Sequence, residues 1–146
     1  MAKTITLHLM GPDDLERLLA VEAGLFDNPF LPDQARAFLN DPAHLLVLAF
    51  AGDQAVGMAT GQVMLHPDKP PAFFIAEVGT RDDWQRQGIA SKVCTRLMDE
   101  ARAMGCEGIW VATEGDNAAA RALYRSLDAR ETGGIVVYDW DGAMDG

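Results

Sequence analysis

The alternation of apolar and polar positions predicts a chain of strands and helices. A continuous apolar run at residues 44–51 is typical of a buried strand. In the long helix that follows residue 88, apolar side chains recur every three or four positions. The expected strands cover residues 4–10, 44–51, 55–65, 72–80, 108–113 and 135–140, and the expected helices cover 11–22, 32–39, 89–104 and 117–127.

These elements predict an α/β (α+β) fold in the order β-α-α-β-β-β-α-β-α-β. Gly52-Asp53-Gln54 is a tight turn between two strands, so residues 44–65 are expected to form a hairpin. Strands alternate with helices in the second half, which favours a mixed, twisted central sheet flanked by helices. At 146 residues without an evident linker, the chain is expected to form a single domain spanning 1–146.

The net charge of the chain limits the classes of molecule that it is expected to bind. The 12 Lys and Arg residues against 22 Asp and Glu residues give a net charge of −10. Such a chain repels nucleic acids and anionic membranes and attracts cations, so no nucleic-acid or membrane partner is expected. Simple solubility is the alternative explanation of the charge.

The chain is expected to be cytoplasmic. Residues Met1–Ile5 lack the apolar core of a signal peptide, and Leu45–Ala51 is far shorter than the ~18 residues of a membrane helix. Cys94 and Cys106 are expected to be reduced packing thiols. Scattered histidines and two cysteines predict no metal site.

The junction between residues 80 and 91 is a candidate anion site. A strand leads into Gln85-Arg86-Gln87-Gly88-Ile89-Ala90, and a helix begins at once. Free backbone N–H groups and the helix dipole would then meet at one point, where Gly88 and Ala90 allow close approach and Arg86 adds positive charge. A pyrophosphate suits this arrangement. The segment lacks the glycines of a Rossmann loop and the Gly-Lys-Ser/Thr of a Walker A loop. An ordinary turn is the alternative.

The motif Gln85-x-x-Gly88-x-Ala90 resembles the acetyl-CoA signature of the GNAT N-acetyltransferases. Asn117, followed by a helix with Leu123-Tyr124, resembles the second landmark of that family. The resemblance implies the GNAT fold, acetyl-CoA as cosubstrate and direct acetyl transfer to an amine. The cofactor-binding residues that it implies are Val78, Gly79, Thr80, Gln85, Arg86, Gln87, Gly88, Ile89, Ala90, Ser91, Asn117 and Tyr124. For Asn117, a helix N-cap is the alternative role, and the two are compatible.

A narrower resemblance links the chain to the type I aminoglycoside 3-N-acetyltransferases, the gentamicin and fortimicin resistance enzymes. It rests on residues 86–90, 114–116, 122–124 and 138–141. It implies an aminoglycoside acceptor and a homodimer. Two positions depart from the pattern: Glu77 stands where that group has Asp, and Leu127-Asp128 replaces the usual Leu-Gly. Asp128 tolerates a left-handed cap, so the fold is expected to survive this change.

Glu77 is the candidate general base. It is the only charged residue between Pro71 and Arg81, within a strand that otherwise reads as core. Partial burial would raise the pKa of its carboxyl and suit it to accept a proton near neutral pH. Two alternatives stay open: a solvated glutamate at a strand end, or a carboxylate that only binds the ammonium while water takes the proton.

Tyr124 is the candidate general acid, because a phenol can give a proton to the leaving thiolate. Packing on the sheet is its alternative role. In the family pattern the backbone of residues 78–80 forms the thioester cradle, and Gly79 is expected to form a bulge there.

A cationic acceptor would need acidic side chains around it. The candidate substrate-binding residues are Asp27, Glu77, Glu114, Asp116, Asp139 and Asp141, with Asp139 and Asp141 expected on one strand face. Surface solvation is the alternative for each. The function alternatives are an acetyltransferase for another amine (a polyamine, an amino acid, a protein N-terminus or a lysine) and a non-catalytic acyl-CoA sensor.

Overall fold

The computed structural model describes residues 4–145 and divides into two compact units, one ending at Val111 and one beginning at Ala112. Residues 1–3 of the N-terminal segment and Gly146 lie outside the described residues. The first unit contains β1 (Ile5–Leu9), α1 (Leu15–Leu19), α2 (Pro32–Asn40), β2 (His44–Ala51), β3 (Gln54–Met64), β4 (Ala72–Thr80), α3 (Ile89–Ala103) and β5 (Ile109–Trp110). Short 3-10 turns precede α1 at Pro12–Asp14 and follow β4 at Asp82–Trp84.

The sheet of the first unit is mixed, as the sequence predicts. Its strands lie in the order β1-β2-β3-β4-β5; the first three pairings are antiparallel and β4 pairs with β5 in parallel. β2 and β3 form the expected hairpin, with Gly52 at φ +60° in its turn. The parallel pairing follows from the crossover through α3.

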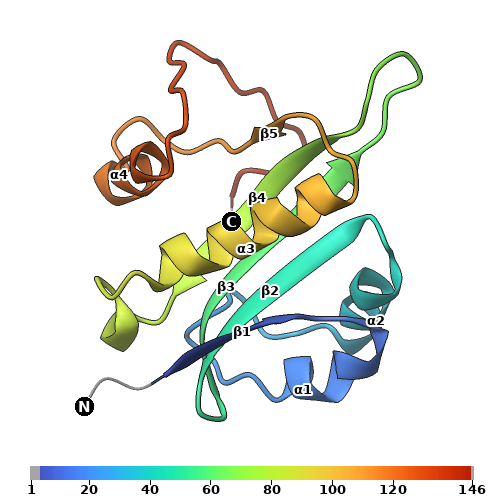
Figure 1. Ribbon diagram of the computed structural model, residues 1–146, viewed down its shortest axis with the longest axis vertical. Coiled ribbons are helices and arrows are strands. Elements are labelled where there is room, and N and C mark those ends of the chain that lie inside the picture. Colours follow the sequence, from blue (N-terminus) through green and yellow to red (C-terminus); the bar gives the residue numbers. More distant parts are fainter. Residues whose placement is uncertain (1–3, 146) are drawn as a thin grey trace. The chain divides into compact units, whose positions relative to one another are not determined.

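Helices cover both faces of this sheet (Figure 1). Along β2, Leu45, Val47 and Ala49 pack in the core beneath α3, whereas Leu46 and Leu48 pack beneath α1 and α2. A strand that is apolar on both faces therefore reads as a continuous hydrophobic run, which is what residues 44–51 show.

The second unit contains one regular element, α4 (Ala118–Ser126), among its described residues. The strand expected at 135–140 is wrong: this segment forms no strand, and its apolar side chains are 59–79% exposed. Val, Ile, Tyr and Trp favour strands, but a strand exists only where a neighbour completes its hydrogen bonds. Asp139 and Asp141 therefore share no strand face, and Asp141 has φ +57°.

Two other elements are shorter than expected. α1 ends at Leu19 rather than Glu22. The Ala20 amide makes the last bond four residues back, to Glu16, and the Val21 amide bonds only three residues back, to Leu18. β5 covers Ile109–Trp110 rather than 108–113, since it pairs with β4 at Phe73 and Phe74 only.

Candidate active site

A β-bulge in β4 sets the geometry of the site. Ile75 pairs with Gly61 and Glu77 pairs with Thr60, so Ala76 is the extra residue. Gly79 pairs regularly with Met58, and the bulge expected at Gly79 is therefore wrong. Gly79 instead allows the backbone of the loop after α1 to lie close to β4. A Cβ at this position would lie 3.3 Å from the carbonyl oxygen of Leu25 in that loop.

The bulge decides which face of the sheet carries Glu77. Phe73 and Ile75 pack in the core beneath α3, and regular alternation would place Glu77 there too. The extra residue reverses the alternation, so Val78 packs against that core. Glu77 consequently shares the α1–α2 face with its cross-strand neighbour Thr60.

The same bulge leaves backbone groups of β4 directed at an open edge. The N–H of Arg81 donates to the carbonyl of Val56 on β3, at 2.9 Å. By alternation, Val78 and Thr80 direct their N–H groups away from β3, toward the side on which β5 would continue. The β4–β5 register stops at Phe74 and Trp110 within residues 4–145, so β4 runs on without β5 beside it. This edge fits the expected thioester cradle at residues 78–80.

Glu77 and Asp27 form the acidic part of the first unit's site. Both side chains are exposed. Loss of surrounding water raises the pKa of the Glu77 carboxyl above its ordinary value of 4.5, and the nearby negative charge of Asp27 raises it further. The structure thus brings together two of the six predicted substrate-binding residues, and it gives one of them the pKa direction that a base needs.

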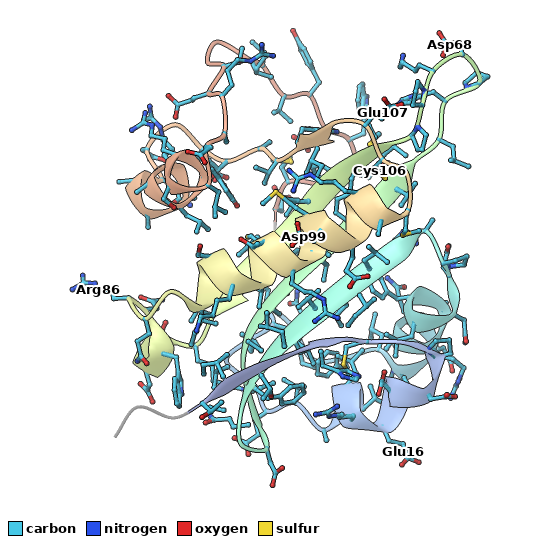
Figure 2. All side chains as sticks on the ribbon, in the orientation of Figure 1. Glu16, Asp68, Arg86, Asp99, Cys106 and Glu107 are labelled. Atoms are coloured by element: carbon cyan, nitrogen blue, oxygen red, sulfur yellow. The ribbon has the colours of Figure 1, made fainter. Side chains whose placement is uncertain are left out.

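The predicted anion loop has the expected backbone geometry. Gly88 is the N-cap of α3 with φ +77°, and Arg86 has φ +63°. The first helical bond runs from Lys92 N–H to Gly88 O, so the preceding amides of 89–91 have no acceptor within the helix. No acidic side chain lies in the first turn. Figure 2 shows Arg86 projecting outward from this loop. The arrangement can hold an anion by the backbone and the helix dipole.

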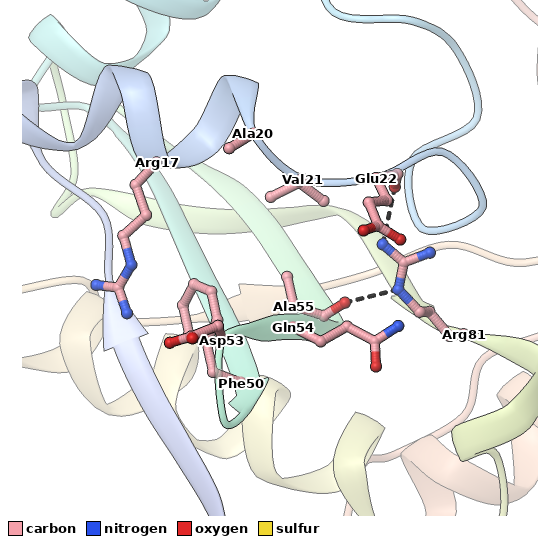
Figure 3. A pocket seen from close by; sticks show the side chains of 9 residues that line it. All are labelled: Arg17, Ala20, Val21, Glu22, Phe50, Asp53, Gln54, Ala55 and Arg81. Atoms are coloured by element: carbon pink, nitrogen blue, oxygen red, sulfur yellow. Dashed lines mark hydrogen bonds between the residues drawn. The ribbon is translucent and has the colours of Figure 1, made fainter.

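Arg81 is a residue whose role the sequence analysis missed. It is only 9% exposed, and its guanidinium donates to three backbone carbonyls: Nε to Ala55 at 2.7 Å, Nη1 to Ala23 and Nη2 to Glu22, both at 2.8 Å. Figure 3 shows it beside a cavity lined by α1 and the β2–β3 turn. Arg81 therefore ties the loop after α1 to the sheet. The available signal was a lone arginine ending an apolar strand.

Replacing Arg81 with methionine should lower the free energy of unfolding by about 3 kcal/mol, because a buried carbonyl loses a charged donor and two others must be rehydrated. Urea denaturation measures this. Arg17→Met is the matched control: Arg17 is an exposed residue of α1 whose guanidinium lies 4.2 Å from the centre of the Phe50 ring, and its loss should cost no more than about 1 kcal/mol. Equal losses of unfolding free energy in the two variants would contradict the role of Arg81 in anchoring the loop after α1 to the sheet.

The remaining candidates belong to the second unit. Asn117 caps α4 by accepting the N–H of Ala120 at 3.0 Å, so the N-cap role is confirmed and a cofactor contact stays a prediction. Tyr124 is half-buried on α4. Asp128 has φ +65°, the left-handed cap expected of it. The four substrate-binding candidates of this unit, Glu114, Asp116, Asp139 and Asp141, are all exposed.

Charged side chains organise the start of α4. Arg121 and Arg125 both bind Glu131, and their hydrogen bonds lower the pKa of Glu131 to about 2. Arg121 also donates to the carbonyl of Gly115 at 2.7 Å. The loop that carries Glu114, Asp116 and Asn117 is thereby fixed to the helix.

The other reactive groups are placed for packing. Burial raises the pKa of the Cys94 thiol to about 11 and also raises that of Cys106, so neither is an activated nucleophile. The residues that the structure describes contain no group of three His, Cys, Asp or Glu side chains placed to hold a metal ion. Within the same residues, no helix is long and apolar enough to span a membrane.

Comparison with known proteins identifies the family. The profile of the acetyltransferase (GNAT) family matches residues 13–128. The chain is 30% identical over 131 residues to the N-alpha-acetyltransferase RimI of Mycobacterium tuberculosis, covering 88% of this chain and 80% of that protein. It is 26% identical over 135 residues to the aminoglycoside N(6')-acetyltransferase type 1 of Serratia marcescens, covering 86% and 92%.

The solved structures agree on the fold. An aminoglycoside acetyltransferase from an uncultured soil metagenomic sample, solved with sisomicin, has a TM-score of 0.78 at 21% identity and covers 94% of this chain and 97% of its own. The AAC(6')-Iy structure with a CoA bisubstrate analogue has a TM-score of 0.79 at 16% identity and covers 94% and 98%. The likeness to the 3-N enzymes is not specifically supported, because the Serratia marcescens enzyme and AAC(6')-Iy both carry the 6' position in their names.

The residues of the first unit fit acetyl-CoA. The left-handed loop and uncovered amides at α3 suit its pyrophosphate, and the open edge of β4 suits its thioester arm. Acetyl-CoA is the cosubstrate with which this family makes N-acetyl products. The protein is an acyltransferase and belongs to the GNAT family of acetyltransferases.

Proposed function

We propose that this protein acetylates an amine of an aminoglycoside antibiotic, with the 3-amine as the expected position, and that its two units act as a single domain. The observation that carries the proposal is the proximity of two carboxylates: Glu77, on the α1–α2 face of the bulged strand β4, and Asp27, in the segment between α1 and α2. Two carboxylates there, on a chain of net charge −10, attract a polycationic acceptor.

Each predicted residue has a chemical task in this proposal. Acetyl-CoA supplies the acetyl group. Glu77 accepts a proton from the acceptor ammonium, which frees the nitrogen lone pair for attack. The N–H groups of Val78 and Thr80 stabilise negative charge on the carbonyl oxygen. Tyr124 gives a proton to the thiolate that leaves. The loop 85–91 and Asn117 hold the cofactor, and the acids of the second unit bind further ammonium groups.

A protein N-terminal amine is the second candidate acceptor. The relatives that favour it are RimI of Mycobacterium tuberculosis and the [ribosomal protein bS18]-alanine N-acetyltransferase of Salmonella typhimurium, which is 29% identical over 131 residues. A peptide terminus offers one ammonium, whereas an aminoglycoside offers several. The number of charges on the acceptor is therefore the property that separates the candidates.

The test is release of free thiol from acetyl-CoA with four acceptors in parallel: gentamicin, spermidine, a lysine peptide and a peptide that begins with alanine. We expect kcat/KM to be highest with gentamicin, and NMR of the product to place the acetyl group on the 3-amine. Turnover of the alanine peptide alone would replace the aminoglycoside with a protein acceptor. Acetyl-CoA binding without turnover of any acceptor would favour the sensor alternative.

Three expectations about the protein's surroundings stay predictions: a homodimer, a cytoplasmic location, and the absence of nucleic-acid and membrane partners. Sedimentation equilibrium of the purified chain tests the first of them.

A further inference from the structure

A buried hydroxyl without a partner lies beside the candidate base. Thr60, on β3, is 6% exposed, and its Oγ1 has no hydrogen-bond partner within residues 4–145. Thr60 pairs directly with Glu77 across the β3–β4 ladder. Directly opposed residues share a face of the sheet, with Cβ atoms about 5 Å apart. The hydroxyl is therefore a near neighbour of the Glu77 side chain.

The rest of the structure gives no packing reason for a hydroxyl at this position. On its other side Thr60 pairs with Leu46 on β2, which is buried and apolar. On the same face of β3, Met58 is also buried and apolar, whereas Gln62 is exposed. Valine has the same branched shape, favours strands equally well, and would bury no unpaired polar atom. Threonine at this position therefore stabilises the fold less than valine would, and residues that lower stability in this way are characteristic of functional positions.

We propose that Thr60 is a positioning residue for Glu77: its hydroxyl donates a hydrogen bond to the Glu77 carboxylate and holds it in one orientation while the acceptor amine is bound. This proposal rests on the proposed role of Glu77 as base. Burial and β-branching restrict the rotamers of the Thr60 side chain, whereas the Glu77 side chain is longer and exposed. One direct hydrogen bond across the β3–β4 ladder selects one orientation of the Glu77 carboxylate.

The test compares Thr60→Val, which removes the hydroxyl and keeps the shape, with Thr60→Ser, which keeps the hydroxyl. We expect kcat to fall about tenfold in Thr60→Val, the loss typical of one hydrogen bond to a charged group, and to stay within about twofold in Thr60→Ser. The thermal midpoint of Thr60→Val should rise by about 3 °C, because the unpaired hydroxyl is gone. Thr6→Val, on the exposed side of β1, is the control and should change neither quantity.

The Glu77→Gln background separates this proposal from the proposed function. If Thr60 acts through Glu77, Thr60→Val should cause no further loss there. An equal further loss would overturn the positioning role, as would a Thr60→Ser enzyme as slow as Thr60→Val, or a Thr60→Val protein that is less stable than the parent. Full activity of Thr60→Val with an inactive Glu77→Gln enzyme overturns only this inference. Full activity of Glu77→Gln overturns the base itself.

Discussion

Glu77→Gln should lower kcat by about 100- to 10,000-fold, the usual contribution of a positioned general base. Glutamine keeps the size and the hydrogen-bonding oxygen of the side chain and cannot accept the ammonium proton. The affinity for acetyl-CoA should stay unchanged, because the loop at residues 85–91 is separate from Glu77 in the sequence and relies on backbone amides. Steady-state kinetics with acetyl-CoA and gentamicin measures both quantities.

The role of Glu77 as a base also predicts the direction in which kcat/KM changes with pH. Glu77 acts as a base only when ionised, and its pKa is raised above 4.5, so kcat/KM should increase with pH through this raised value. Asp27→Asn removes a charge that raises the pKa, so the acidic limb should move to lower pH. Glu77→Gln should lack this limb altogether. An acidic limb that persists in Glu77→Gln would assign it to another group.

The thermal midpoint of each variant shows whether a loss of activity comes from damage to the fold. Because the folded state binds the Glu77 proton more tightly than the unfolded chain, ionisation of Glu77 weakens the fold: its favourable contribution is complete below 4.5 and is lost as the pH rises through the raised pKa. Glutamine stays neutral at all pH values. The thermal midpoint of Glu77→Gln near neutral pH should therefore equal or exceed that of the parent, and a lower midpoint would mean that lost activity reflects damage to the fold.

Local signals in the sequence were sufficient for the sheet and its two helical layers. The apolar run at 44–51, the turn at Gly52 and the helical spacing after Gly88 each agree with one element, because each pattern is satisfied by neighbouring residues. The segment 135–140 failed for the opposite reason. Its composition is that of a strand, yet a strand requires a hydrogen-bonded neighbour, which composition does not encode.

The candidate site residues stand out in the sequence, but the register that sets their orientation does not. Glu77 stood out as a lone charge in an apolar strand, and Gly88 stood out at a helix start. The bulge at Ala76 was invisible, because alanine carries no bulge signal, and yet it decides that Glu77 faces α1–α2. Arg81 and Thr60 were missed because their roles depend on contacts with residues at least 17 positions away in the chain.

Gly88→Asp should raise the KM for acetyl-CoA about 10- to 100-fold relative to Gly88→Asn. Gly88 has φ +77°, and a Cβ there would meet nothing within 4 Å. Asp and Asn both tolerate the left-handed conformation and both cap helices, so the two variants share one shape and differ by one charge. That charge would lie where the pyrophosphate is expected, and like charges a few ångströms apart repel by about 1–4 kcal/mol.

The direction of the stability change makes this comparison decisive. A negative charge at the N-terminus of α3 interacts favourably with the helix dipole, so Gly88→Asp should be at least as stable as Gly88→Asn while binding acetyl-CoA more weakly. Added salt should narrow the difference in KM, because it screens repulsion at an exposed loop. Equal KM values for the two variants would mean that no anion binds at this helix start, and the cofactor would then have to be held by other residues.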